Sequence, residues 1–153
     1  MMLIKLAESA SEIKKCYSVF SQLHSHLLEK DFVALVQEQQ ENGYKLVSLE
    51  VDDAVKSVAG FHLGNSFGWR TYLYVDDFVT DEASRSKGYG AKLFSWLVEY
   101  GKQNSCNQVH LDSRVTRYSA HKFYLNQGMI IGGYHFLMDL TYSGSQSSEA
   151  QSC

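Results

Sequence analysis

Val79-Thr-Asp-Glu-Ala-Ser-Arg85-Ser-Lys-Gly88-Tyr-Gly90-Ala-Lys-Leu93-Phe94 marks a change of hydrophobic pattern in the middle of the chain. The residues before it are β-branched and aromatic, as in a strand, whereas the apolar residues after it recur at helical spacing. Two glycines let the backbone turn between these patterns and leave no Cβ over the first helical turn. The unpaired N–H groups and the dipole of that turn favour an anion. The stretch therefore predicts a strand-to-helix loop that binds phosphate.

Neither of the two common nucleotide signatures fits this loop. A Walker loop needs Gly-x-x-x-x-Gly-Lys-Ser/Thr, and a dinucleotide fingerprint needs three glycines in Gly-x-Gly-x-x-Gly. The pattern present is Arg85-x-x-Gly88-x-Gly90. It resembles the acyl-CoA loop of the GCN5-related N-acetyltransferases (GNAT family), which reads Gln/Arg-x-x-Gly-x-Gly/Ala at the start of the central helix. An ordinary glycine-rich connector is the alternative for the loop taken alone.

A second motif strengthens the resemblance. Arg117-x-x-Ala120-His-Lys-Phe-Tyr124-Leu-Asn-Gln-Gly128-Met is similar to the family's Asn-x-x-Ala-x-x-Phe-Tyr-x-x-x-Gly-Phe. The chain departs from the family at three positions, with Arg117 for an asparagine, Met129 for a phenylalanine and Glu82 where a proline often precedes the loop. Of these, only the arginine bears on a side-chain contact to the cofactor.

The hydrophobic periodicity predicts an α/β (α+β) fold. Strands are expected at 3–6, 44–51, 55–63, 69–80 and 108–113, and helices from Ser9 or Ser11 to 20, from a cap at Asp31 to 41, from the loop to about 101, and at 119–126. A last hairpin is expected from strands 129–131 and 134–140 around Gly132-Gly133. The order β-α-α-β-β-β-α-β-α-β-β is that of the GNAT fold. The resemblance thus implies a mixed, mostly antiparallel sheet of six or seven strands with helices on both faces.

The resemblance implies acetyl-CoA as co-substrate and a set of residues that bind it. These are Phe78, Val79, Thr80, Arg85, Ser86, Lys87, Gly88, Tyr89, Gly90, Ala91, Arg117 and Ala120. The backbone at 78–80 would pair with the pantetheine arm and donate to the thioester oxygen. A fully paired ladder leaves no free N–H groups, so the strand ending at Thr80 should splay from the strand ending near Ser113. The resemblance also places Tyr124 beside the thioester sulfur as the general acid, with a core aromatic as the alternative role.

A general base must take the proton of the acceptor ammonium. We favour Asp76 or Asp77, because aspartate is depleted from strand interiors and two in succession require a local cause. Strand neighbours point to opposite faces, so only one of the two should reach the amine and be needed for turnover. Which one is left open, and His110 and Asp112 on the next strand are further candidates.

Composition restricts the classes of function. The net charge is −3 with 20% charged residues and no basic run, which argues against a nucleic-acid partner. Three cysteines without a Cys-x-x-Cys pair fit reduced thiols in a cytoplasmic protein without a zinc site. The N-terminus lacks an apolar run long enough for a signal peptide or membrane span. His24 and His26 are more consistent with surface or acceptor-site residues than with metal ligands.

The sequence therefore predicts one acyl-CoA N-acyltransferase domain over 1–142 and a flexible polar tail over 143–153. The expected activity is direct transfer of an acetyl group to a primary amine of a small molecule or peptide. Its acceptor site should be framed by 20–31, Asp76-Asp77 and the last hairpin near Tyr134-His135. The competing class is a non-catalytic acyl-CoA-binding regulatory module, and an RNA-binding or scaffold protein would lack the basic surface it needs. A homodimer is compatible with the sequence but not required by it.

Overall fold

The computed structural model describes residues 1–141, which fall into two units, Met1–Leu111 and the residues from Asp112 onward. The predicted polar tail, 143–153, lies outside the described residues. Within the described part of the chain, no helix has the length and hydrophobicity needed to cross a membrane.

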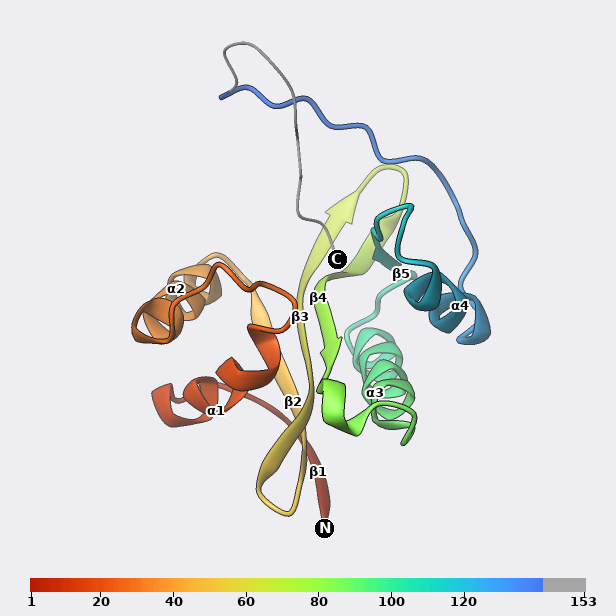
Figure 1. Ribbon diagram of the computed structural model, residues 1–153. Helices are drawn as coiled ribbons and strands as arrows, with labels where there is room; N and C mark the ends of the chain where they lie inside the picture. Colours follow the sequence, from red (N-terminus) through yellow and green to blue (C-terminus); the bar gives the residue numbers. More distant parts are fainter. Residues whose placement is uncertain (142–153) are drawn as a thin grey trace. The chain divides into compact units, whose positions relative to one another are not determined.

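The first unit is built on a five-stranded sheet whose strands lie side by side in chain order (Figure 1). The strands are β1 (Met2–Leu6), β2 (Lys45–Val51), β3 (Ala54–Ser66), β4 (Arg70–Thr80) and β5 (Gln108–Leu111). The first four pair antiparallel, and β5 pairs parallel to β4. A parallel neighbour requires a crossover connection, which α3 (Tyr89–Gln103) supplies. The predicted mixed, mostly antiparallel sheet and its βαβ unit are confirmed.

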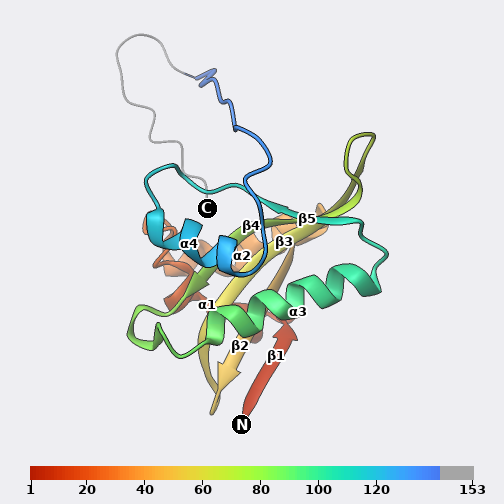
Figure 2. The same ribbon diagram turned by 90° about the vertical axis from the view of Figure 1, so that its right-hand side faces the viewer.

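Helices cover both faces of this sheet. Figures 1 and 2 show α1 (Ala10–Phe20) and α2 (Glu29–Glu41) on one face and α3 on the other. On the first face, buried residues of α1, α2 and the strands form one apolar cluster, which contains Ala7, Ile13, Cys16, Val19, Phe20, Phe32, Val36, Leu46, Val58 and Val79. The amphipathic pattern of each helix therefore predicts the side that it buries.

The observed N-terminus of α1 agrees with the one predicted from the sequence, whereas that of α2 differs from its prediction. Ser9 caps α1 through a capping box with Glu12, as one of the two predicted serines. The predicted cap Asp31 is wrong, because α2 begins earlier, after Leu28 in extended backbone, and Asp31 lies in its first turn. There its charge still complements the helix dipole.

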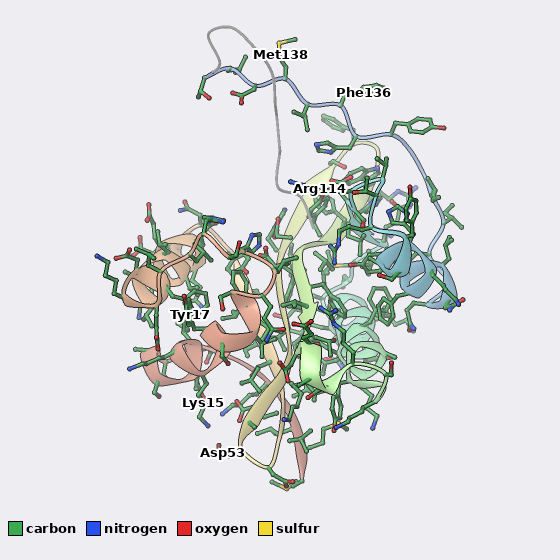
Figure 3. The ribbon with its side chains drawn as sticks, in the orientation of Figure 1. Lys15, Tyr17, Asp53, Arg114, Phe136 and Met138 are labelled. Atoms are coloured by element: carbon green, nitrogen blue, oxygen red, sulfur yellow. The ribbon has the colours of Figure 1, made fainter. Side chains whose placement is uncertain are left out.

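The second unit contains α4 (Tyr118–Asn126), close to its predicted range. The predicted last hairpin is wrong, because residues 129–141 form no strand and the described sheet has five strands instead of six or seven. Phe136 and Met138 project from extended backbone and are 90% and 83% exposed (Figure 3). An isolated hairpin is marginal in water unless a further strand or a helix packs on it. The alternating pattern alone therefore does not produce a strand pair here.

Candidate active site

The loop between β4 and α3 has the features of an anion site. A short 3₁₀ turn, Glu82–Ser84, precedes it, and Gly88 then caps α3 with φ +80°, a left-handed conformation suited to glycine. No side chain caps α3, and its first turn contains no acidic residue, in contrast to α1 with its Ser9 cap. A Cβ at Gly88 would meet no other atom within 4 Å. The first-turn N–H groups of α3 thus have no capping side chain, and exposed Arg85 and Lys87 lie nearby in the chain.

The strand before this loop extends past its parallel neighbour. Pairing between β4 and β5 runs only from Tyr72 to Val75 on β4, opposite Gln108 to Leu111. The residues Phe78 to Thr80 pair with β3 on their other side. No described strand pairs with the other edge of Phe78 to Thr80, which agrees with the predicted splay between β4 and β5. The Phe78 ring packs against Phe94 of α3. The unpaired edge of Phe78 to Thr80 therefore consists of backbone N–H and C=O groups.

A β-bulge in β4 determines where the two candidate aspartates point. Gly60 of β3 lies opposite Asp77, whereas Phe61 lies opposite Val75, so Asp76 is the extra residue. The bulge interrupts the strand alternation, and both carboxylates line the same pocket on the face covered by α1 and α2. The prediction that they point to opposite faces is therefore wrong. Strand alternation holds only while the ladder is regular.

Asp77 is held by two side chains from different elements. Its Oδ1 lies 2.5 Å from His24 Nε2, and its Oδ2 accepts a hydrogen bond of 2.7 Å from the Tyr44 hydroxyl. The Tyr44 ring reaches this position by crossing over Gly60. A Cβ on Gly60 would overlap the Tyr44 hydroxyl and ring. The missing side chain of Gly60 thus makes the Tyr44–Asp77 contact possible.

Asp76 forms a second, more accessible pair. Its Oδ2 lies 2.7 Å from His62 Nδ1, and the Asp76 side chain is 34% exposed against 13% for Asp77. The His62 ring stacks on Tyr74 at 5.4 Å between ring centroids. Burial raises the pKa of Asp76, and the bond to His62 partly offsets that rise. A carboxylate against an imidazole is an arrangement that can accept and hold a proton.

These groups open into a pocket of about 750 Å³ formed by α1, α2, the connection between them and the sheet. Its described lining comprises Phe20, His24, His26, Leu27, Phe32, Leu35, Val36, Glu38, Gln39, Asn42, Tyr44, His62, Asp76 and Asp77. The connection is fixed in part by Tyr17 of α1 (Figure 3), whose hydroxyl donates to the Leu27 carbonyl at 2.8 Å. The pocket combines an apolar wall with three carboxylates and three histidines, which suits an acceptor amine.

Sequence reasoning found some of these residues and missed others. Residues of the segment 20–31 and the two aspartates, which were expected to frame the acceptor site, line this pocket. Tyr134 and His135, the third expected part, are not in its lining and belong to the second unit. His62 and Tyr44 were missed, because only cross-strand register and the gap over Gly60 bring them to Asp76 and Asp77. The alternative base His110 is outside the pocket lining and stacks on Trp69 at 3.7 Å between ring centroids.

The second unit carries the remaining predicted residues. Tyr124 is buried, with 6% of its surface exposed, and its ring lies 5.5 Å from that of Phe123. Arg117 precedes α4, and its buried Nη1 has no hydrogen-bond partner among the described residues. Ala120 lies in the first turn of α4. The other base candidate, Asp112, lies 3.3 Å from His135 in the same unit. Roles in catalysis or cofactor binding for these residues stay predictions.

Comparison with known families identifies the chain. The acetyltransferase (GNAT) family model matches residues 8–129, which include the loop, the pocket and α4. The chain belongs to the GNAT acetyltransferase family. It is 29% identical over 138 residues to the "Uncharacterized N-acetyltransferase YhdJ" of Bacillus subtilis (strain 168), a match that covers 89% of this chain and 97% of the relative.

Solved structures of GNAT proteins share the fold. An acetyltransferase of Trypanosoma brucei superposes with a TM-score of 0.75 at 19% identity, over 92% of this chain and all of the other. Glucosamine-6-phosphate N-acetyltransferase of Arabidopsis thaliana gives 0.74 at 19% identity, over 92% and 99%. The aminoglycoside N-acetyltransferase AAC(6')-Iy, solved in complex with CoA, gives 0.79 at 12% identity, over 91% and 94%. The GNAT fold expected from the sequence is thereby confirmed.

Proposed function

We propose that this protein transfers an acetyl group from acetyl-CoA to a primary amine bound in the α1–α2 pocket. The observation that carries the proposal is the bulge in β4, which points Asp76 and Asp77 together into a pocket of about 750 Å³. The same strand leads directly into the uncapped N-terminus of α3. One strand therefore connects an amine site to an anion site, which is the arrangement that transfer between an amine and an acyl-CoA needs.

Acetyl-CoA would be held by the residues before and within the first turn of α3. The N–H groups after Gly88 have no side-chain cap and suit a diphosphate, to which Arg85 and Lys87 add positive charge. The backbone of Phe78 to Thr80 would bind the pantetheine arm along the strand edge that β5 leaves unpaired. By resemblance to the family motif, Arg117 would add a guanidinium group, whose Nη1 has no hydrogen-bond partner among residues 1–141. These features fit an extended anionic cofactor.

His62 and Asp76 form the proton-accepting pair in this proposal. Asp76 holds Nδ1 of the imidazole, while Nε2 has no hydrogen bond to any described residue and is available to the amine. Asp77 is a positioning residue, because its two oxygens are engaged by His24 and Tyr44. The acceptor ammonium first gives a proton to His62, which passes it to solvent, and the nitrogen becomes a neutral amine. When that nitrogen bonds to the acetyl carbon and the carbon–sulfur bond breaks, His62 takes a second proton from it. Tyr124 donates a proton to the departing sulfur.

The test is turnover by the purified full-length chain. Acetyl-CoA is incubated with a panel of primary amines, and both free CoA and the acetylated product are quantified by mass spectrometry. We expect stoichiometric CoA and acetyl-amine, with His62→Gln and Asp76→Asn each lowering kcat by ~10²-fold. Tight acetyl-CoA binding without product from any amine would instead support a non-catalytic acyl-CoA-binding module.

A further inference from the structure

The charge of the acceptor pocket is one-sided. Glu38, Asp76 and Asp77 line it, and none of its described lining residues is lysine or arginine. Two of these carboxylates are paired with histidines, but the Glu38 carboxylate has no ion pair or hydrogen bond to any residue in the range 1–141. Its backbone carbonyl accepts a hydrogen bond from Asn42 Nδ2. Such a pocket favours a cationic acceptor and repels a phosphorylated or carboxylated one.

The negative charge is divided between two walls. Asp76 and Asp77 come from the bulge of β4 on the sheet side. Glu38 comes from α2, where Leu35, Glu38, Gln39 and Asn42 follow one another at spacings of three and four and thus share one helix face. Glu38 is exposed, as expected for a group at the pocket mouth, whereas Asp77 is buried. A cation at either wall of the pocket would therefore lie next to a carboxylate.

The surface that completes the pocket is apolar. Leu27, Leu35 and Val36 line it together with the rings of Phe20 and Phe32. Hydrocarbon surface of this kind stabilises methylene groups by removing them from water. The pocket volume lies within the ~300–1,000 Å³ range of small-molecule sites.

We propose that the acceptor is an aliphatic diamine or polyamine. This inference rests on the proposed acetyltransferase function and adds its substrate class. One primary amine lies at His62 and Asp76 and is acetylated. The alkyl chain lies against Leu27, Leu35 and Val36, and the second cationic nitrogen lies at Glu38. The acetylated product loses one of its positive charges, so it binds less well to a pocket with these carboxylates and is released.

The experiment compares amines of matched length, n-pentylamine and cadaverine, with spermidine and glucosamine 6-phosphate as further probes. We expect kcat/KM for cadaverine to exceed that for n-pentylamine by about 5-fold or more, because a partly exposed ion pair contributes about 1 kcal/mol. Glu38→Gln should reduce this ratio to near one by raising the KM for cadaverine. Glu41→Gln, an exposed glutamate on the same helix outside the pocket lining, is the matched control and should retain the ratio.

The outcomes separate the two proposals. Equal use of n-pentylamine and cadaverine, an unchanged ratio in Glu38→Gln, or a preference for glucosamine 6-phosphate would overturn the diamine proposal and leave the acetyltransferase proposal standing. A complete lack of acetylated product from every amine would overturn both.

Discussion

Gly60→Ala on β3 should disrupt the site by displacing the Tyr44 ring that lines the pocket. The backbone φ of Gly60 lies outside the left-handed region, so alanine itself is tolerated there. Its Cβ, however, would overlap the Tyr44 hydroxyl and lie 2.6 Å from Tyr44 Cε2, which forces the ring away. The hydrogen bond of 2.7 Å from Tyr44 to Asp77 is then lost.

The expected cost combines two terms. Losing a hydrogen bond to a charged group costs roughly 1.5–3 kcal/mol, and displacing a packed ring costs ~1–3 kcal/mol. Because the terms overlap, we expect the free energy of unfolding to fall by about 3 kcal/mol. For a chain of this size each kcal/mol lowers Tm by ~2–4 °C, so the melting temperature should fall by roughly 6–12 °C. The KM for the amine should rise as well, because Tyr44 and Asp77 line the pocket.

Thermal unfolding and steady-state kinetics test this on four variants: Gly60→Ala, Gly64→Ala, Tyr44→Ala and the double variant Tyr44→Ala/Gly60→Ala. Gly64→Ala is the control for a ring clash outside the pocket lining, because its Cβ would meet Tyr72, with Cε2 at 2.8 Å. The Tyr72 ring contacts His62 only edge-on, at 6.3 Å between ring centroids. The Gly64→Ala variant should lose stability while retaining the KM for the amine. In a Tyr44→Ala background, Gly60→Ala should add almost no further destabilisation, since the clash is gone. Full additivity, or an unchanged Tm in Gly60→Ala, would refute the reasoning.

Three further predictions concern the two binding sites and the acid. Gly88→Val should weaken acetyl-CoA binding by on the order of 100-fold in a folded protein, because the branched side chain enters the open space over the α3 N-terminus. Titration calorimetry measures this affinity, and an unchanged value would place the cofactor elsewhere. Burial raises the pKa of Asp76, so ionisation of its carboxyl disfavours folding. The free energy of unfolding therefore falls as the pH rises from the pKa of Asp76 in the unfolded chain to its higher pKa in the folded protein. Asp76→Asn should therefore lose that pH dependence and melt no lower than the wild type at neutral pH while kcat falls by ~10²-fold, and a lower melting temperature there would contradict this account. Tyr124→Phe should lower kcat by ~10²-fold without changing acetyl-CoA affinity or Tm, since only the hydroxyl is removed; normal turnover would make Tyr124 a packing residue.

The order of the elements from β1 to α4 and the glycine loop before α3 could be predicted from the sequence. Helical and strand periodicity are local properties, so α1, α3, α4 and the strands of the meander appear near their predicted ranges. The glycine pattern after β4 likewise depends on local backbone requirements, and Gly88 has the positive φ that only such a residue adopts easily. Family membership follows from the same short-range motifs.

Tertiary structure decided which side chains line the candidate acceptor pocket. The bulge at Asp76 arises from the register between β3 and β4, which a period-two pattern does not reveal. His62 and Tyr44 reach the two aspartates only through cross-strand pairing and the space over Gly60. The predicted C-terminal hairpin is wrong because its local pattern was present without the tertiary partner that a strand needs. Alternating apolar residues at 134–140 are a local signal, but a strand exists only where a neighbouring strand satisfies its backbone, and the described residues supply none.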